Sequence, residues 1–187
     1  MASDGLRNEV ISTMIRDDIS RVAKHDEVVL AFGESLNRKL GRRQANHISQ
    51  RMRQLARLVL QLRKDNGNED SQLRDYINPE RFDVVVGAVK EVSRFDQADT
   101  TKVGVPSMAL KLGHSLTNCA AIVRGIGLGL KCATTIENAG YFLELMKDTW
   151  SEEISTHALT TLGERKFNQP EILPVNEELL KVRKITF

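Results

Sequence analysis

The sequence contains few of the residues on which several classes of protein depend. Aromatic residues make up 5% of its 187 residues, and there are two cysteines and four prolines. Two cysteines are too few for the disulfide framework of a small secreted protein. No apolar run approaches the roughly 18 residues that a membrane-spanning helix requires, and the first residues lack the pattern of a secretory signal. We therefore expect an intracellular protein, nuclear or cytoplasmic, that does not act in a membrane.

Signals for β-structure are also scarce. No run alternates apolar and polar residues at period two, and no Asn-Gly or Asp-Gly turn separates two β-branched runs. Apolar residues instead recur every three or four positions, as in amphipathic helices. We predict an all-α fold, a compact bundle of six or seven helices. The predicted helices are 26–40, 43–64, one beginning at 79, 106–131, 135–148, 151–166 and 176–185.

The chain divides into a short N-terminal part and a longer helical part. Residues 1–25 are expected to form an arm or a helix, and they include the amphipathic stretch 10–22. Residues 26–187 are expected to form a single helical domain. Its last helix, 176–185, would lead towards a C-terminal domain that this chain lacks. The helix 106–131 is predicted to be the central, buried one, with an apolar face formed by Leu112, Leu116, Cys119, Val123, Ile126 and Leu130.

Positive charge is concentrated in two stretches, although the net charge is only +2. From Leu36 to Lys64 there are nine basic residues and no acidic one. From Thr100 to Ile136 there are four basic residues, again without an acidic one. Such clustering attracts polyanions, so nucleic acid is a candidate partner.

The helix 43–64 carries the strongest functional signal. One side has an apolar stripe from Ile48 to Leu62, and at about 100° per residue most basic residues fall on the opposite side. This basic side has no glutamate that could form the ion pairs usual on a solvated helix, and the planar arginine group suits phosphate oxygens. We expect it to contact duplex DNA, although a plain solvated surface is the alternative. The candidate DNA-binding residues are Arg42, Arg43, Arg53, Arg57 and Lys64, with Lys111 and Arg124 as weaker candidates.

No pattern typical of a catalytic or metal site is present. The four histidines and two cysteines have no zinc-binding spacing, and no serine or cysteine lies in a recognised nucleophile motif. The glycine-rich run 125–131 lies late in a helix, which favours a closely packed helix end over a phosphate loop. His114 is interpreted as a structural histidine with satisfied hydrogen bonds. We expect no catalytic residues, no metal and no cofactor.

Four blocks of the sequence, taken together, are distinctive: 46–64, 77–90, 105–120 and 150–178. In this order they resemble the N-terminal helical half of metazoan proteins related to Crypton-type tyrosine recombinases. In that family the helical half resembles a core-binding domain, which clamps one side of duplex DNA and precedes a catalytic half. The resemblance implies a SAM-like, core-binding-like bundle that binds DNA.

The chain departs from that family in its catalytic features. The family's catalytic half carries arginines, a His-x-x-Arg element and a terminal tyrosine nucleophile. None of the histidines here has arginine three residues later, and the only tyrosines, Tyr76 and Tyr141, lie inside the helical region. The resemblance therefore implies a non-catalytic DNA-binding domain derived from a recombinase-like protein, without the catalytic half.

Two other functions remain open at this level. The chain could be a protein-interaction or oligomerisation module that docks through its C-terminal helix or through the stretch 10–22. It could also be an enzyme whose site is assembled from residues far apart in the sequence, although no such site is visible.

Overall fold

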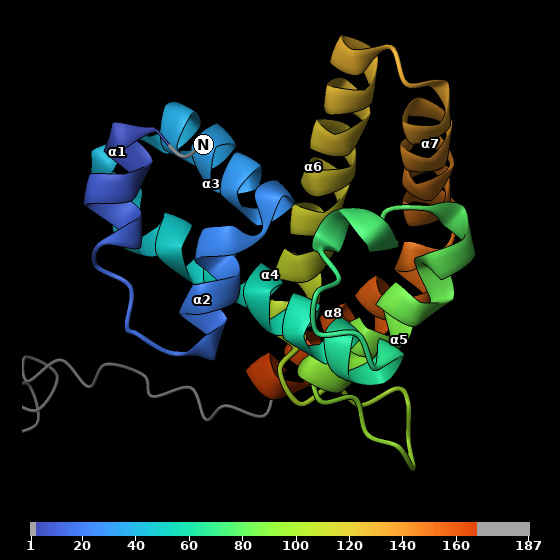
Figure 1. Ribbon diagram of the computed structural model, residues 1–187. Helices are drawn as coiled ribbons and strands as arrows, with labels where there is room; N and C mark the ends of the chain where they lie inside the picture. The colour runs from blue at the N-terminus through green and yellow to red at the C-terminus, as the bar shows by residue number, and fades with distance from the viewer. Residues whose placement is uncertain (1–2, 168–187) are drawn as a thin grey trace, which may run out of the picture.

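Two helices, α4 (Ala45–Asn66) and α6 (Pro106–Leu130), form the centre around which the other helices pack. In the computed structural model, which describes residues 3–167, α4 contacts α2 (Asp18–His25), α3 (Glu27–Leu40), α5 (Phe82–Val92) and α6 (Figure 1). The prediction that 106–131 is a central helix is confirmed for its inner half, because α6 contacts α3, α4 and α5 as well as the helices that follow it. The apolar stripe predicted for α4 is also confirmed as core: Ile48, Met52, Leu55, Val59 and Leu62 are all 0% exposed.

The N-terminal residues pack onto the same core as the rest of the chain. They form α1 (Asp4–Leu6), a π-helical turn at Arg7–Ile11 and then α2. Leu6 and Val10 are fully buried, and Val22 is nearly so. Their apolar side chains contribute to the core shared with α3 and α4. The stretch 10–22, considered above as a docking surface, is therefore used by the protein's own interior.

Asp26 joins the N-terminal helices to the segment that follows α4. Its Oδ1 atom caps α3 by accepting hydrogen bonds from the backbone N–H groups of Val28 and Val29, both at 3.0 Å. Its Oδ2 atom accepts the backbone N–H of Leu73 at 2.7 Å, where a 3₁₀ turn (Leu73–Tyr76) begins. Asp26 is 1% exposed, and this burial raises the pKa of its carboxyl group. One buried carboxylate thus fixes two elements that are far apart in the sequence.

The residues just before α5 determine where this helical segment begins. Asn78 accepts the backbone N–H of Arg81 at 3.0 Å, and Pro79 occupies the first position of a 3₁₀ turn, Pro79–Arg81, that leads into α5. The predicted start of this helical segment at position 79 is confirmed. Phe82 then packs edge-on against Phe142 of α7 (Ala133–Asp148), with ring centroids 5.5 Å apart.

Helices α6 and α7 form a hairpin that rises above the rest of the chain in Figure 1. The inner half of α6 is buried, with Leu112 and Leu116 at 0% exposure. Further along, Leu130 is 68% exposed, so the prediction that the apolar face stays buried to this point is wrong. The reason is that the end of α6 extends beyond the bundle and α7 covers only one side of it.

The last described part of the chain returns to the body of the bundle. After the buried Trp150, a π-helical turn (Ser151–Ser155) leads into α8 (Thr156–Phe167), which packs on α6. Residues 3–167 thus contain eight α-helices and no strand, with a single isolated bridge between Phe95 and Val103. The all-α class is confirmed. The predicted helix 176–185 lies outside the described residues.

Candidate nucleic-acid interface

The middle of the predicted basic face is occupied by an ion pair. Arg53 donates from Nη1 to Asp17 Oδ1 at 2.9 Å and from Nη2 to Asp17 Oδ2 at 2.5 Å. The Arg53 side chain is only 15% exposed, and the paired guanidinium lowers the pKa of Asp17 to about 2. Since Asp17 also caps α2, this pair fastens α2 onto α4. The assignment of Arg53 to DNA contact is therefore corrected, because its donors are already used within the protein.

Two further arginines of α4 also serve the fold. Arg51 donates to the hydroxyl of Ser115 on α6 at 2.8 Å, and burial lowers the pKa of its guanidinium group. Arg63 donates to the backbone carbonyl of Ser71 at 2.8 Å, which holds the loop after α4. The central position of α4 explains these contacts, because arginines on a helix with neighbours on several sides meet protein before they meet solvent.

The cations at the two ends of the face remain exposed. Arg42 lies at the start, and its side chain is 83% exposed with one loose contact, 3.7 Å from Nε to Glu9 Oε1. Arg43, Arg57 and Lys64 are exposed and form no ion pair with any residue from 3 to 167. The face that the sequence predicts as continuous is thus split into two parts by the segment around Asp17.

The first part extends into the turn between α3 and α4. The last residues of α3 and the 3₁₀ turn Arg42–Gln44 flank Gly41. Gly41 has φ of 68°, a conformation that favours glycine, and its tight turn brings the ends of the two helices together. No side chain caps the N-terminus of α4, and no acidic residue lies in its first turn. We call the four exposed cations of this segment the basic turn: Arg38, Lys39, Arg42 and Arg43.

Sequence reasoning counted Arg38 and Lys39 among the nine bases but did not place them in the site. A helical wheel gives the positions of residues around one helix, so it does not show that the last residues of α3 lie beside the first residues of α4. The signal that could have found them is Gly41 at the end of a helix with bases on both sides, since a glycine there indicates a tight turn.

The second part lies at the other end of α4. Arg57 and Lys64 border a shallow hollow of about 410 Å³, together with Arg94, which follows α5. Its apolar floor consists of Ile19, Leu60 and Val92, and Glu91 lies at the edge. Arg43 and Arg57 are 14 residues apart, about 21 Å along the helix at 1.5 Å per residue.

The two weaker candidates on α6 do not join either part. Lys111 and Arg124 are both exposed but lie 13 residues apart, which is about 20 Å along the helix and about 140° around it. They therefore point to different sides of α6. The structure gives them no common surface.

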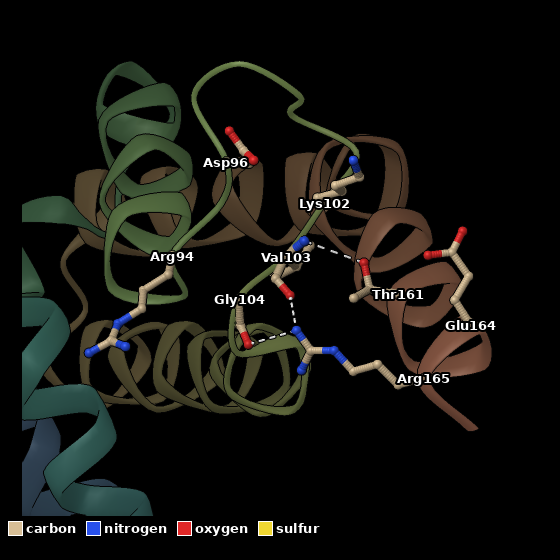
Figure 2. Close-up of a pocket in the computed structure, with 8 residues that line it drawn as sticks. All are labelled: Arg94, Asp96, Lys102, Val103, Gly104, Thr161, Glu164 and Arg165. Atoms are coloured by element: carbon tan, nitrogen blue, oxygen red, sulfur yellow. Dashed lines mark hydrogen bonds between the residues drawn. The ribbon is translucent and has the colours of Figure 1, made fainter. Parts of the chain in front are cut away.

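A separate hollow of about 460 Å³ lies between the segment 94–104 and α8 (Figure 2). Arg165 reaches across it and donates to the backbone carbonyls of Val103 at 2.9 Å and Gly104 at 3.0 Å. The backbone N–H of Val103 donates to Thr161 Oγ1 at 3.3 Å. These contacts pin the loop to α8. The remaining lining mixes Arg94 and Lys102 with acidic side chains, so this hollow has no single sign of charge.

The histidines and cysteines are dispersed. No three His, Cys, Asp or Glu side chains within residues 3–167 are arranged to hold a metal ion. His114 is exposed on α6. Cys119 is fully buried, which raises the pKa of its thiol. Cys132 is exposed, and a hydrogen bond donated by Thr135 at 3.2 Å lowers its pKa.

No family model, curated protein or solved structure matches the chain. Among residues 3–167, no helix combines the length and the apolar character needed to cross a bilayer.

Proposed function

We propose that the protein binds duplex DNA without catalysis, and that the basic turn is its main phosphate contact. The observation that carries this proposal is the concentration of four exposed cations within six residues, Arg38 to Arg43, on two helix ends brought together by Gly41. Only Arg42 among them has an acidic neighbour within ion-pair distance in the described chain, and that contact is loose.

The local backbone supports an anion at this place. The N-terminus of a helix carries partial positive charge, and no acidic residue lies in the first turn of α4. The 3₁₀ turn Arg42–Gln44 leads directly into α4, since the Ala45 N–H donates to the Arg42 carbonyl, so the helix and the basic turn are continuous. Arginine side chains beside such a terminus suit phosphate oxygens. Arg57 and Lys64, at the far end of α4, form a second and smaller contact.

The resemblance to the helical half of Crypton-type recombinase-related proteins agrees with this proposal. We propose on that basis that the bundle is a core-binding-like domain and that it lacks strand-cleaving activity of its own. A protein-interaction module without nucleic-acid binding is the competing function.

The experiment compares two variants with the same change of net charge. Lys39→Gln plus Arg43→Gln removes two cations of the basic turn. Arg81→Gln plus Lys147→Gln removes two exposed cations from other elements and serves as the control. Affinity for a labelled duplex is measured by fluorescence anisotropy at about 0.1 M salt.

We expect the basic-turn variant to bind on the order of 50-fold more weakly. Each phosphate contact contributes about 0.9 to the logarithmic salt slope, so two contacts contribute about 1.8 decades of affinity at about 0.1 M salt relative to 1 M. The control variant should bind nearly as well as the wild type. Two duplexes of unrelated sequence should bind alike, since phosphate contacts do not read bases. Equal losses in both variants, or no binding by the wild type, would reject the proposal and favour the interaction module.

A further inference from the structure

The outer part of α6 carries a line of apolar side chains that extends beyond the bundle. Ile122, Ile126 and Leu130 are spaced by four residues, so they lie along one side of the helix. Ile122 and Ile126 are half-buried, and Leu130 is 68% exposed. The line therefore continues from half-buried positions to an exposed one, and it is this continuity that makes it a candidate surface for a partner.

Ile122 and Ile126 of this line form one wall of a groove between α6 and α3. The groove has a volume of about 320 Å³, and Leu30 and Ala31 of α3 form its other apolar wall.

The rim of the groove carries two carboxylates. Glu27 has one loose contact with Arg74 at 3.8 Å. Glu34 accepts a hydrogen bond from the neutral Ser3 hydroxyl. Arg38 of the basic turn is the one cation of the lining and lies at the end of the groove. A polyanion such as DNA is disfavoured at a rim with two carboxylates, so the occupant should be apolar and cationic.

The end of the hairpin has this character. Arg124 and Lys131 are exposed there, and no acidic residue occurs between Thr100 and Ile136. The hairpin end, with Leu130 and Lys131, therefore complements the groove in both polarity and charge. Because both surfaces belong to one chain, two copies can satisfy each other in a symmetric contact.

We propose that the protein forms a dimer in which α6 of each copy packs antiparallel against α6 of the other, crossing near Ile126. Leu130 of each copy then enters the groove of the second copy, and Lys131 approaches its acidic rim. Gly125 and Gly129 allow close approach of the two helices, because a methyl group built at either position meets nothing within 4 Å in one copy. The groove shares Arg38 with the basic turn, but the variants that test the dimer leave Arg38 unchanged, so their outcome does not depend on the proposed phosphate contact.

Sedimentation equilibrium tests the dimer directly. The monomer has a mass of 21.0 kDa, and the wild type should approach twice this mass at roughly 100 μM, where an interface of micromolar affinity is mostly occupied. Leu130→Glu should remain monomeric at that concentration. Leu159→Glu changes a leucine of similar exposure, 57%, on α8 and should dimerise like the wild type. A monomeric wild type, or equal behaviour of the two variants, would overturn the proposal.

A distance measurement tests the arrangement of the two helices. Cys132 is exposed and Cys119 is buried, so a thiol spin label should attach to Cys132 alone. Six residues on each side of a crossing at Ile126 separate the two labels by about 18 Å along the helices, and helices pack 8–10 Å apart. Electron double resonance should therefore give a distance near 20 Å. A distance below about 10 Å would mean that the hairpin ends meet, and it would overturn the antiparallel arrangement.

Discussion

Replacing Asp26 tests how the N-terminal helices are held to the rest of the bundle. Asp26→Ala removes the acceptor for three backbone N–H groups, those of Val28, Val29 and Leu73. Asp26→Asn is the matched variant. Its amide oxygen can still cap α3, but its NH₂ group then faces the Leu73 N–H, which loses its acceptor.

The losses in free energy of unfolding of the two variants can be estimated from the hydrogen bonds that each one removes. Loss of an N-cap costs about 1 kcal/mol, and a buried N–H without a partner costs about 1–3 kcal/mol. Asp26→Ala incurs both terms, and relief of the buried charge offsets a part of them. We expect Asp26→Ala to lower the free energy of unfolding by about 2–4 kcal/mol and Asp26→Asn by about 1–3 kcal/mol.

The assay is urea unfolding followed by the fluorescence of Trp150, the only tryptophan, which is 5% exposed. The pH dependence has a defined sign. Burial raises the pKa of Asp26 above its ordinary value of 3.8, so the folded state holds this proton to a higher pH than the unfolded state does. The wild type therefore loses stability as pH rises from 3.8 through the raised pKa. Asp26→Asn cannot titrate, so its deficit relative to the wild type should be larger at low pH than at pH 7.

Two results would refute this reasoning. If Asp26→Ala is as stable as the wild type, the three hydrogen bonds do not hold the segments together. If Asp26→Asn is as damaging as Asp26→Ala at every pH, the carboxylate acts as a charge and not as a set of backbone acceptors.

Three further predictions concern other contacts. Because pairing with Arg53 lowers the pKa of Asp17 from 3.8 to about 2, its contribution to stability is present above pH 3.8 and is lost as pH falls towards 2. Urea unfolding should therefore show Asp17→Asn less stable than the wild type at pH 6 and equal to it at pH 2; a constant difference would contradict this. Gly113→Ala should lower the free energy of unfolding by about 1–3 kcal/mol, because the new methyl group lies 2.9 Å from Trp150 Cε2. Gly87→Ala on the exposed side of α5, with open space around it, should raise the free energy of unfolding by about 0.5–1 kcal/mol, and the opposite order of the two variants would be inconsistent with the packing. A thiol reagent should label Cys132 in the native protein and Cys119 only after unfolding, as mass spectrometry can show; native labelling of Cys119 would mean that the core opens there.

Local patterns in the sequence predicted local structure well. The stripe from Ile48 to Leu62 is buried, the helical segment before α5 begins at Pro79, and α3 ends at Leu40. Each of these features depends on residues within one or two turns of each other. Period and capping chemistry are therefore sufficient to find them.

The candidate site was harder to predict because it depends on which helices are neighbours. A helical wheel assigns Arg53 to the solvent side of α4, yet α2 covers that side and Asp17, 36 residues earlier, pairs with it. The same lack of tertiary information extended the buried face of α6 as far as Leu130, which is exposed. Arg38 and Lys39 were missed for the converse reason, since only the folded turn places them beside Arg42.

The dependence of DNA binding on salt tests the central claim most directly. If the four cations of the basic turn each neutralise one phosphate, they contribute about −3.6 to the slope of log Kobs against log salt concentration, and Arg57 and Lys64 bring the total to about −5.4, from about −0.9 per contact. Lys39→Gln plus Arg43→Gln should make the slope shallower by about 1.8, while Arg81→Gln plus Lys147→Gln should leave it unchanged. A slope that is the same for all three proteins would contradict the assignment of the basic turn as the phosphate contact.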